Sequence, residues 1–235
     1  MKKLVLMIAM IAAAAALCAC GDNDSASQAQ TPAGTTVDLT EFKAVTSGTA
    51  QPAGTQYNFP VLTGSDNQGG VYTGSYARIS VGPTLFEGQA MTQSREVFTT
   101  QRGADAPVTS TTDRYFKAAN MAIYKIVASD GIVSTPAPWN LPTGAIPASA
   151  KIGDIGSANT HLNSDGTTYT FAWTLTGDIN GGSQFAISLF RSGSATVKPG
   201  TQTTTYYLDA NGRPTRIAIS TWIDTLKSTL TGNRE

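Results

Sequence analysis

Residues suited to catalysis are few in this chain of 235 residues. His161 is the single histidine, so a zinc site built from several histidines or a cysteine–histidine cluster is excluded. A Ser-His-Asp triad would have to use His161, but the G-x-S-x-G and S-x-x-K patterns that place a nucleophilic serine are absent. We therefore expect no catalytic residue, cofactor or metal ligand, and we expect His161 to be an exposed residue at a strand edge.

Three acids lie in or near expected strands, at Glu87, Glu96 and Asp113. Glycoside hydrolysis needs two carboxylates that converge in space, and a sequence alone does not show convergence. The alternative is that each acid lies on a solvated face or beside a cation; the candidate cations are Arg95, Arg114 and Lys125. An envelope hydrolase therefore stays open as a minor reading.

Two cysteines follow a basic and then apolar N-terminus, in which Lys2-Lys3 precede a run from Leu4 to Leu17. The run is shorter than the ~20 residues that span a bilayer. Leu17-Cys18-Ala19-Cys20 resembles the lipobox of a bacterial lipoprotein signal peptide. The resemblance implies cleavage by signal peptidase II before Cys20, a diacylglyceryl thioether on Cys20 and commonly acylation of its new amino group. Two or three chains give stable membrane attachment.

An ordinary secretory signal cleaved near Ala19 is the rival reading, and it would leave Cys20 as a free thiol. Gly21 follows Cys20 at the position where lipoprotein families retained in the inner membrane often carry Asp. We therefore expect a location in the cell envelope, anchored to the outer membrane and facing the periplasm.

Composition after cleavage fits an extracytoplasmic β protein. Removal of residues 1–19 leaves 216 residues with 14 basic and 16 acidic side chains, a formal charge of −2. No basic patch emerges, which argues against nucleic acid as a partner. The expected partners are the membrane, through the lipid on Cys20, and an envelope protein, glycan or lipid. Cys20 is the only cysteine left, so the mature chain has no internal disulfide.

The chain divides by composition into five parts. Residues 1–19 read as the signal peptide and residues 20–54, rich in small and polar types, as a flexible tether. Within that tether Leu39–Val45 has the pattern of a short helix or strand. Residues 55–133 form a first β half, residues 134–150 a proline-rich linker, and residues 151–235 a second β half. A weak repeat of aromatic and threonine-rich strands relates the two halves.

Period-two alternation dominates from about residue 57 onward. In the clearest case Tyr169, Phe171, Trp173 and Leu175 share one face, which predicts a strand with one buried side. The other expected strands are Tyr57–Leu62, Gly70–Val81, Ala90–Gln101, Thr109–Phe116, Ala122–Ser129, Ser183–Phe190, Thr203–Leu208 and Thr215–Ile223.

Turn chemistry joins these strands. Asn211-Gly212 supplies the positive φ values of a tight hairpin, and Asp209–Gly212 and Ser164–Gly166 lack the further oxygen ligands and closing glutamate of a calcium loop. We predict a mostly β fold of antiparallel meanders, in which two related sheet halves form a curved sheet or an open barrel. In its order of elements the mature region is similar to uncharacterised bacterial envelope lipoproteins, a resemblance that implies no activity.

Aromatic side chains either fill a core or line a concave surface. The set is Tyr72, Tyr76, Tyr115, Phe116, Tyr169, Trp173, Tyr206 and Tyr207. The pattern of anchor, tether and β domain favours a lipid-anchored envelope lipoprotein with a non-catalytic binding or scaffold role. The alternative is a carrier of a lipid or another apolar ligand in a half-barrel cavity, similar to the periplasmic lipoprotein-sorting proteins. A solvent-connected apolar cavity would favour the carrier.

Overall fold

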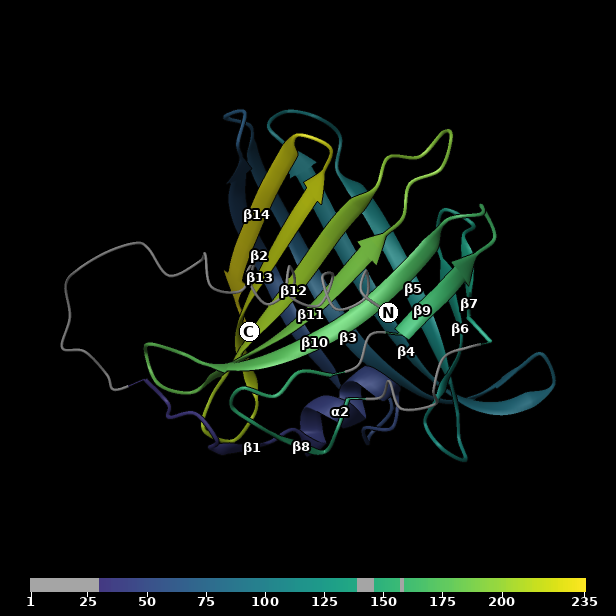
Figure 1. The fold of residues 1–235 in the computed structure, drawn as a ribbon, viewed down its shortest axis with the longest axis vertical. Coiled ribbons are helices and arrows are strands. Elements are labelled where there is room, and N and C mark those ends of the chain that lie inside the picture. The colour runs from purple at the N-terminus through teal and green to yellow at the C-terminus, as the bar shows by residue number, and fades with distance from the viewer. Residues whose placement is uncertain (1–29, 139–145, 157–158) are drawn as a thin grey trace, which may run out of the picture.

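A closed antiparallel β-barrel dominates the structure, a computed structural model that describes residues 30–138, 146–156 and 159–235. Twelve strands close the barrel in the order β10-β11-β12-β13-β14-β2-β3-β4-β5-β6-β7-β9 (Figure 1). In chain order they are β2 Gln56–Asp66, β3 Val71–Phe86, β4 Gln89–Arg102, β5 Val108–Lys117, β6 Ile123–Ala128, β7 Val133–Pro136, β9 Asn159–Asn163, β10 Thr168–Gly177, β11 Ser183–Arg191, β12 Gly200–Leu208, β13 Pro214–Ile223 and β14 Leu226–Asn233. The mostly β, antiparallel fold is confirmed, and its barrel is closed.

Alternation along the strands decides which side chains enter the barrel. In β10, Leu175 is fully buried, and Tyr169, Phe171 and Trp173 line an internal cavity. The neighbouring β11 places Ile187 opposite Trp173 and Leu189 opposite Phe171, so their side chains share the inner surface. The predicted inward face of β10 is therefore confirmed. The opposite face is not wholly solvated as predicted, because Ala172 and Thr174 on it are buried as well.

The Asn-Gly hairpin also forms as predicted, between β12 and β13. Gly212 has φ +73°, and the amide N–H of Asp209 donates to the carbonyl oxygen of Arg213 across 2.9 Å. A Cβ on Gly212 would lie 1.8 Å from the carbonyl oxygen of Asp38, so only glycine fits this turn against the preceding segment.

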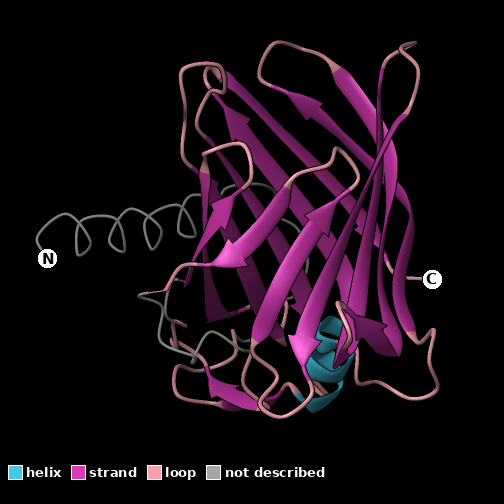
Figure 2. Cartoon of the chain, turned by 90° about the vertical axis from the view of Figure 1, so that its right-hand side faces the viewer, coloured by secondary structure: helices cyan, strands magenta, loops and turns pink. Residues whose placement is uncertain are grey.

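One end of the barrel is closed by a short helix, α2 (Thr40–Ser47), with a two-stranded sheet of β1 (Thr36–Asp38) and β8 (Ser149–Lys151) beside it (Figure 2). Leu39, Phe42 and Val45 are fully buried and pack into the barrel core. Gly48 ends the helix in the left-handed conformation, and its N–H donates to the carbonyl oxygen of Val45.

The tether expected over residues 20–54 is corrected by this arrangement, since residues 36–50 are folded. Small and polar residues dominate the segment by composition, but three apolar side chains at a spacing of three carry its packing. Its first ten residues lie outside the described residues, as do the lipobox residue Cys20 and the signal peptide expected over residues 1–19.

The expected linker over residues 134–150 is also corrected. β7 pairs with both β6 and β9, and β8 pairs with β1, so both ends of this segment belong to sheets. Pro136 is the last residue of β7, and its missing N–H does not stop the pairing with β9, since the next N–H, of Ala137, donates to the carbonyl oxygen of Thr160 across 2.9 Å. The two expected β halves meet through β7 and β9 on one side and through β14 and β2 on the other, and they form one barrel. Residues 139–145 of the linker lie outside the described residues.

No helix in the described part of the chain has the length and apolar character needed to cross a membrane.

Candidate functional site

The barrel interior holds a cavity of about 320 Å³, bounded by described residues. It extends from Thr46 and Ser47 of α2 to Ser129 and Asp130 in the turn between β6 and β7. Those two regions lie at opposite ends of the strands, so the cavity occupies the barrel above the closing helix. Its volume falls at the lower end of the range found for small-molecule sites, roughly 300–1,000 Å³.

Apolar side chains form most of the cavity wall. They are Phe98, Phe116, Met121, Ile123, Ile126, Ile146, Phe171, Trp173, Ile187 and Leu189. Trp173 stacks on Phe185 with ring centroids 5.3 Å apart, which fixes one face of the indole while it stays only partly buried. Several of these inward-facing side chains therefore keep accessible surface that faces the cavity.

The aromatic residues singled out from the sequence divide between core, cavity and exterior. Tyr76, Tyr206 and Phe116 are buried, and Phe116, Tyr169, Trp173 and Tyr206 line the cavity. Two others make contacts on the outer surface, where Tyr115 stacks on Phe86 at 3.8 Å and Tyr207 lies 3.7 Å from the guanidinium of Arg216. Tyr72 is partly buried and packs against the core, with Arg102 near its ring. The two readings of these aromatics thus apply to different members of the set.

A cluster of charged groups lies in the same cavity. Glu96 of β4 accepts from Arg78 of β3 at Oε2 across 2.9 Å, and Arg114 Nη1 of β5 lies 3.4 Å from the same oxygen. All three side chains are largely buried, with exposed fractions of 16%, 8% and 15% respectively. Three adjacent strands place these residues on their inner faces, so the sheet geometry brings the charges together.

Two tyrosines extend this cluster. The hydroxyl of Tyr76 donates to Glu96 Oε2 across 3.1 Å, and the hydroxyls of Tyr76 and Tyr206 are 2.6 Å apart. Burial is the main cause that raises the pKa of Tyr206 to about 12, so both phenols stay neutral hydrogen-bonding groups. Burial alone would raise the pKa of Glu96, but the charges of Arg114 and Arg78 outweigh it and hold that pKa below its ordinary value.

Positive charge is in excess in this cluster, because two guanidinium groups face one carboxylate. Arg78 is anchored further by the carbonyl oxygen of Thr46 and by Ser94 Oγ, at 3.0 and 3.3 Å. Arg78 Nε and Arg114 Nη1 are buried and make no hydrogen bond with the described residues. Burial first, and repulsion from Arg78 second, lower the pKa of Arg114. Buried donors without acceptors are unfavourable, so the cluster is suited to an added anion.

His161 lies inside the barrel, which corrects the expectation of an exposed residue. It is 2% exposed, lines the cavity and packs edge-on against Phe171 with ring centroids 5.1 Å apart. Its position in β9 has inward parity, which a lone histidine in a short strand does not reveal. Burial, and next the charge of Arg114, lower its pKa to about 4, so His161 is neutral at pH 7.

The three candidate acids do not converge. Glu87 lies at the β3–β4 turn, where Tyr124 donates to it across 2.8 Å and Lys125 pairs with it. Asp113 accepts two hydrogen bonds from Arg95, at 2.8 and 3.0 Å. Only Glu96 of the three lines the cavity. Among the residues that the structure describes, no group of three or more His, Cys, Asp or Glu side chains could hold a metal ion.

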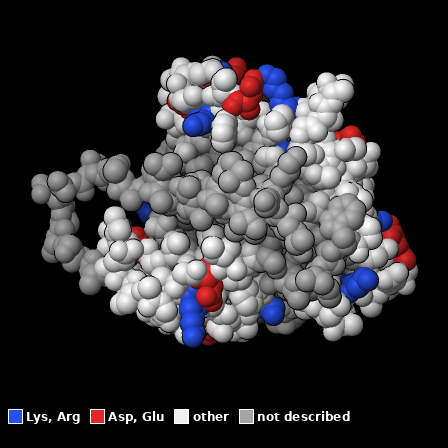
Figure 3. Space-filling model, in the orientation of Figure 1, with Lys and Arg blue, Asp and Glu red and all other residues white. Residues whose placement is uncertain are grey.

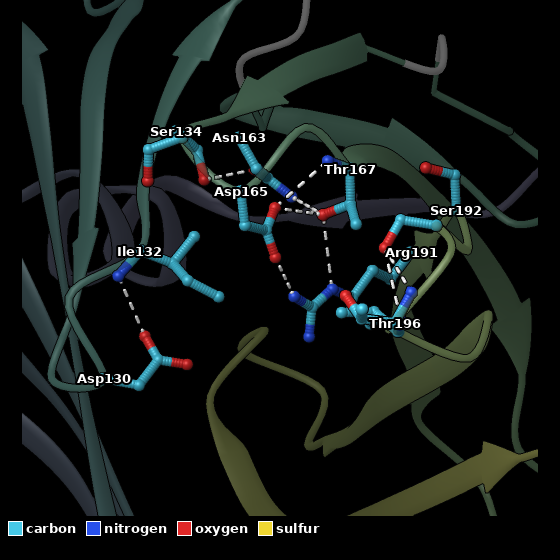
Figure 4. Close-up of polar contacts among 12 residues, drawn as sticks. Asp130, Ile132, Ser134, Asn163, Asp165, Thr167, Arg191, Ser192 and Thr196 are labelled. Atoms are coloured by element: carbon cyan, nitrogen blue, oxygen red, sulfur yellow. Dashed lines mark hydrogen bonds and ion pairs between the residues drawn. The ribbon is translucent and has the colours of Figure 1, made fainter.

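Polar side chains tie the strands together at the end away from α2. Arg191 pairs with Asp165, which accepts from Thr167 Oγ1 across 2.7 Å, and Asn163 links Thr167 to Ser134 with bonds of 2.8 and 2.6 Å (Figure 4). These residues come from β7, β9, β11 and the β9–β10 turn. The network holds together the part of the barrel where β7 and β9 are only four and five residues long.

The outer surface contrasts with the interior. On the face drawn in Figure 3, the Lys and Arg side chains of the described residues lie in mixed groups with Asp and Glu. Ion pairs such as Lys198–Asp224 and Arg213–Glu41 are of this exposed kind. Inside the barrel, by contrast, two guanidinium groups face one carboxylate.

The sequence analysis did not identify Arg78, and it named Arg114 only as a cation that could lie beside one of the acids, which it does beside Glu96. The sequence held one signal for these two arginines, because residues two apart in a strand lie on the same face. Arg78 stands two residues after Tyr76, and Arg114 stands two residues before Phe116. An arginine on the same strand face as buried aromatic residues is expected to point into the barrel.

Comparison of the chain with protein-family models, with curated proteins and with solved structures finds no match.

Proposed function

We propose that this chain is a lipid-anchored binding protein of the cell envelope that holds a small apolar molecule inside its β-barrel. The observation that carries the proposal is the cavity of about 320 Å³ above α2, with its wall of aromatic and aliphatic side chains. The anchor rests on the lipobox resemblance of Leu17-Cys18-Ala19-Cys20, and the cavity supports only the binding role.

Partial exposure inside the barrel gives the driving force for binding. Phe171, Trp173 and Leu189 face inward yet remain only partly buried. An apolar molecule that covers them removes further surface from water, which is worth about 25 cal/mol for each Å². Because the strands form a closed barrel, the site is largely preformed, and binding does not require ordering of the wall.

Of the functions left open by the sequence, this proposal corresponds to the carrier of an apolar ligand. The cavity lies in a closed barrel instead of the half-barrel that the sequence suggested. The cavity favours it over a scaffold role, which would require no internal cavity. The hydrolase reading loses its support, since Glu87 and Asp113 are engaged in separate ion pairs away from Glu96.

Titration with N-phenyl-1-naphthylamine, a neutral dye that brightens in apolar surroundings, tests the binding role. We expect saturable binding of one dye to each chain. Ile187→Trp places a larger side chain into the cavity and should weaken binding at least tenfold. Ala186→Trp, one residue away on the outer face of β11, is the matched control and should leave it unchanged.

Overpacking costs about 1–3 kcal/mol of stability, so circular dichroism is needed to establish that both variants are folded. Absence of saturable dye binding by the folded native chain would refute the binding role. Equal effects of the two variants would place the dye outside the barrel.

A further inference from the structure

The cavity combines an apolar wall with one buried cation that has too few partners, and both features restrict the ligand. Arg114 lies in β5 between Thr112 and Phe116, and Ile126 of β6 is its neighbour in the adjacent strand register. Arg114 therefore contacts Glu96 on one side and has apolar residues of the cavity wall as neighbours on the other.

The charges that face this cavity are few. Lys43 lies at the helix end and Asp130 at the opposite end, and Arg78, Glu96 and Arg114 lie between them. His161 is neutral at pH 7. Arg78 is held by Glu96, the carbonyl oxygen of Thr46 and Ser94, whereas Arg114 shares Glu96 with it at the longer distance of 3.4 Å. Each guanidinium keeps one buried donor without a hydrogen bond to the described residues, Arg78 Nε and Arg114 Nη1, but Arg114 has the weaker contact with Glu96 and none of the further partners that hold Arg78.

A neutral ligand would leave that excess charge uncompensated, and a cationic ligand would add to it. A ligand with one negative charge, together with Glu96, would balance the two guanidinium groups and supply acceptors for Arg114. A planar carboxylate matches the fork of N–H groups on a guanidinium. The rest of the ligand must be apolar, because the remaining wall offers mainly aromatic and aliphatic surface.

We propose that the cavity, taken as the binding site proposed above, accepts an aliphatic monocarboxylate whose carboxylate pairs with Arg114 and whose chain contacts Phe171, Trp173 and Leu189. The cavity volume suits a chain of medium length. At about 30 Å³ for each water-sized group, 320 Å³ holds about eleven such groups, and octanoate has about ten non-hydrogen atoms.

Isothermal titration of the full chain at pH 7.5 with three probes of equal chain length tests this ligand class without any variant. The probes are octanoate, octan-1-ol and octyltrimethylammonium. We expect octanoate to bind at least tenfold more tightly than octan-1-ol, and the cation to bind most weakly. If all three bind equally, the proposed ligand class is wrong and the binding role stands. If none binds and the naphthylamine dye does not bind either, the proposed function itself is wrong.

Arg114→Met tests the assigned cation, because it keeps a long side chain and removes the charge. We expect it to abolish the preference for octanoate over octan-1-ol while octan-1-ol binding changes less than threefold. Arg95→Met on neighbouring β4, whose arginine pairs with Asp113 on the outer face, is the matched control and should keep the preference. A preference for octanoate that survives Arg114→Met in a folded chain would overturn the assignment. If that variant does not fold, Arg114→Lys replaces it and should retain part of the preference; an undiminished preference there would also count against the guanidinium.

Discussion

Glu96→Gln perturbs the buried charge cluster with the least change of shape. The carboxylate oxygen that holds Arg78 at 2.9 Å and faces Arg114 at 3.4 Å becomes part of a neutral amide. Both guanidinium groups then remain buried without a counter-charge. Removal of one partner of a buried ion pair costs about 3–5 kcal/mol, so we expect the free energy of unfolding to fall by that amount at pH 7.

Asp113→Asn on the adjacent strand is the comparison. Its partner Arg95 is 43% exposed, and exposed ion pairs contribute about 0–1 kcal/mol. Urea unfolding followed by circular dichroism measures both variants against the native chain. A loss below about 1 kcal/mol for Glu96→Gln, or equal losses for the two variants, would refute the view that the cluster depends on this carboxylate.

The pH dependence of stability gives a second test of the Glu96 carboxylate. The pKa of Glu96 is lowered in the folded chain, so its contribution to stability is present above the unfolded pKa of about 4.3 and is lost as the pH falls through the lower folded value. Glu96→Gln should therefore flatten the fall in stability below about pH 4. A native chain and a variant with parallel stability profiles in this range would contradict the low pKa.

The pKa of His161, lowered to about 4, predicts a loss of stability as the pH falls from 6.5 towards 4, because only the unfolded chain binds the proton there. The gap corresponds to about 3 kcal/mol, and His161→Phe should remove this component in unfolding curves measured between pH 7 and pH 4; a profile unchanged by the variant would count against burial of a neutral ring. Trp173→Ala should cost about 3 kcal/mol in the same urea assay, the low end for buried aromatics, because one side of the indole faces the cavity. Thr170→Ala, on the outer face, should stay within about 0.5 kcal/mol. Equal costs would mean that burial of this face extends from Ala172 and Thr174 to Thr170. Cys20→Ala should abolish palmitate labelling and leave the precursor uncleaved, and labelling lost only in Cys18→Ala would move the lipid to the other cysteine.

Local pattern was enough to predict the strands and their turns. The alternation of Tyr169, Phe171, Trp173 and Leu175 marks a one-sided strand, and Asn211-Gly212 marks a hairpin, because both signals depend on neighbouring residues. Barrel closure depends instead on the pairing of β14 with β2, in which Ser228 lies opposite Asp66. No local signal encodes that distant pairing, so the sequence left a curved sheet and an open barrel as the expectations.

The site escaped prediction for a related reason. The sequence marked Glu96 as a possible acid of a hydrolase or as the partner of a cation such as Arg114, and nothing in it distinguished Arg78 from the other polar residues of a long strand. The charge cluster forms only because three neighbouring strands each direct one charged side chain into the barrel. The expected short helix or strand at Leu39–Val45 is present as α2, but the sequence placed it within a tether. The packing of Leu39, Phe42 and Val45 depends on the barrel and has no local signal.

Quenching of Trp173 by a bromine-labelled chain tests most directly whether the barrel interior is a ligand site. Replacement of Trp139 and Trp222 by Phe leaves Trp173 as the only indole of the chain. Because bromine quenches indole fluorescence only at close range, 8-bromooctanoate should quench Trp173 in a saturable manner, and unlabelled octanoate should reverse the quenching. Quenching that rises linearly without saturation, or no quenching in a folded chain, would contradict a ligand site inside the barrel.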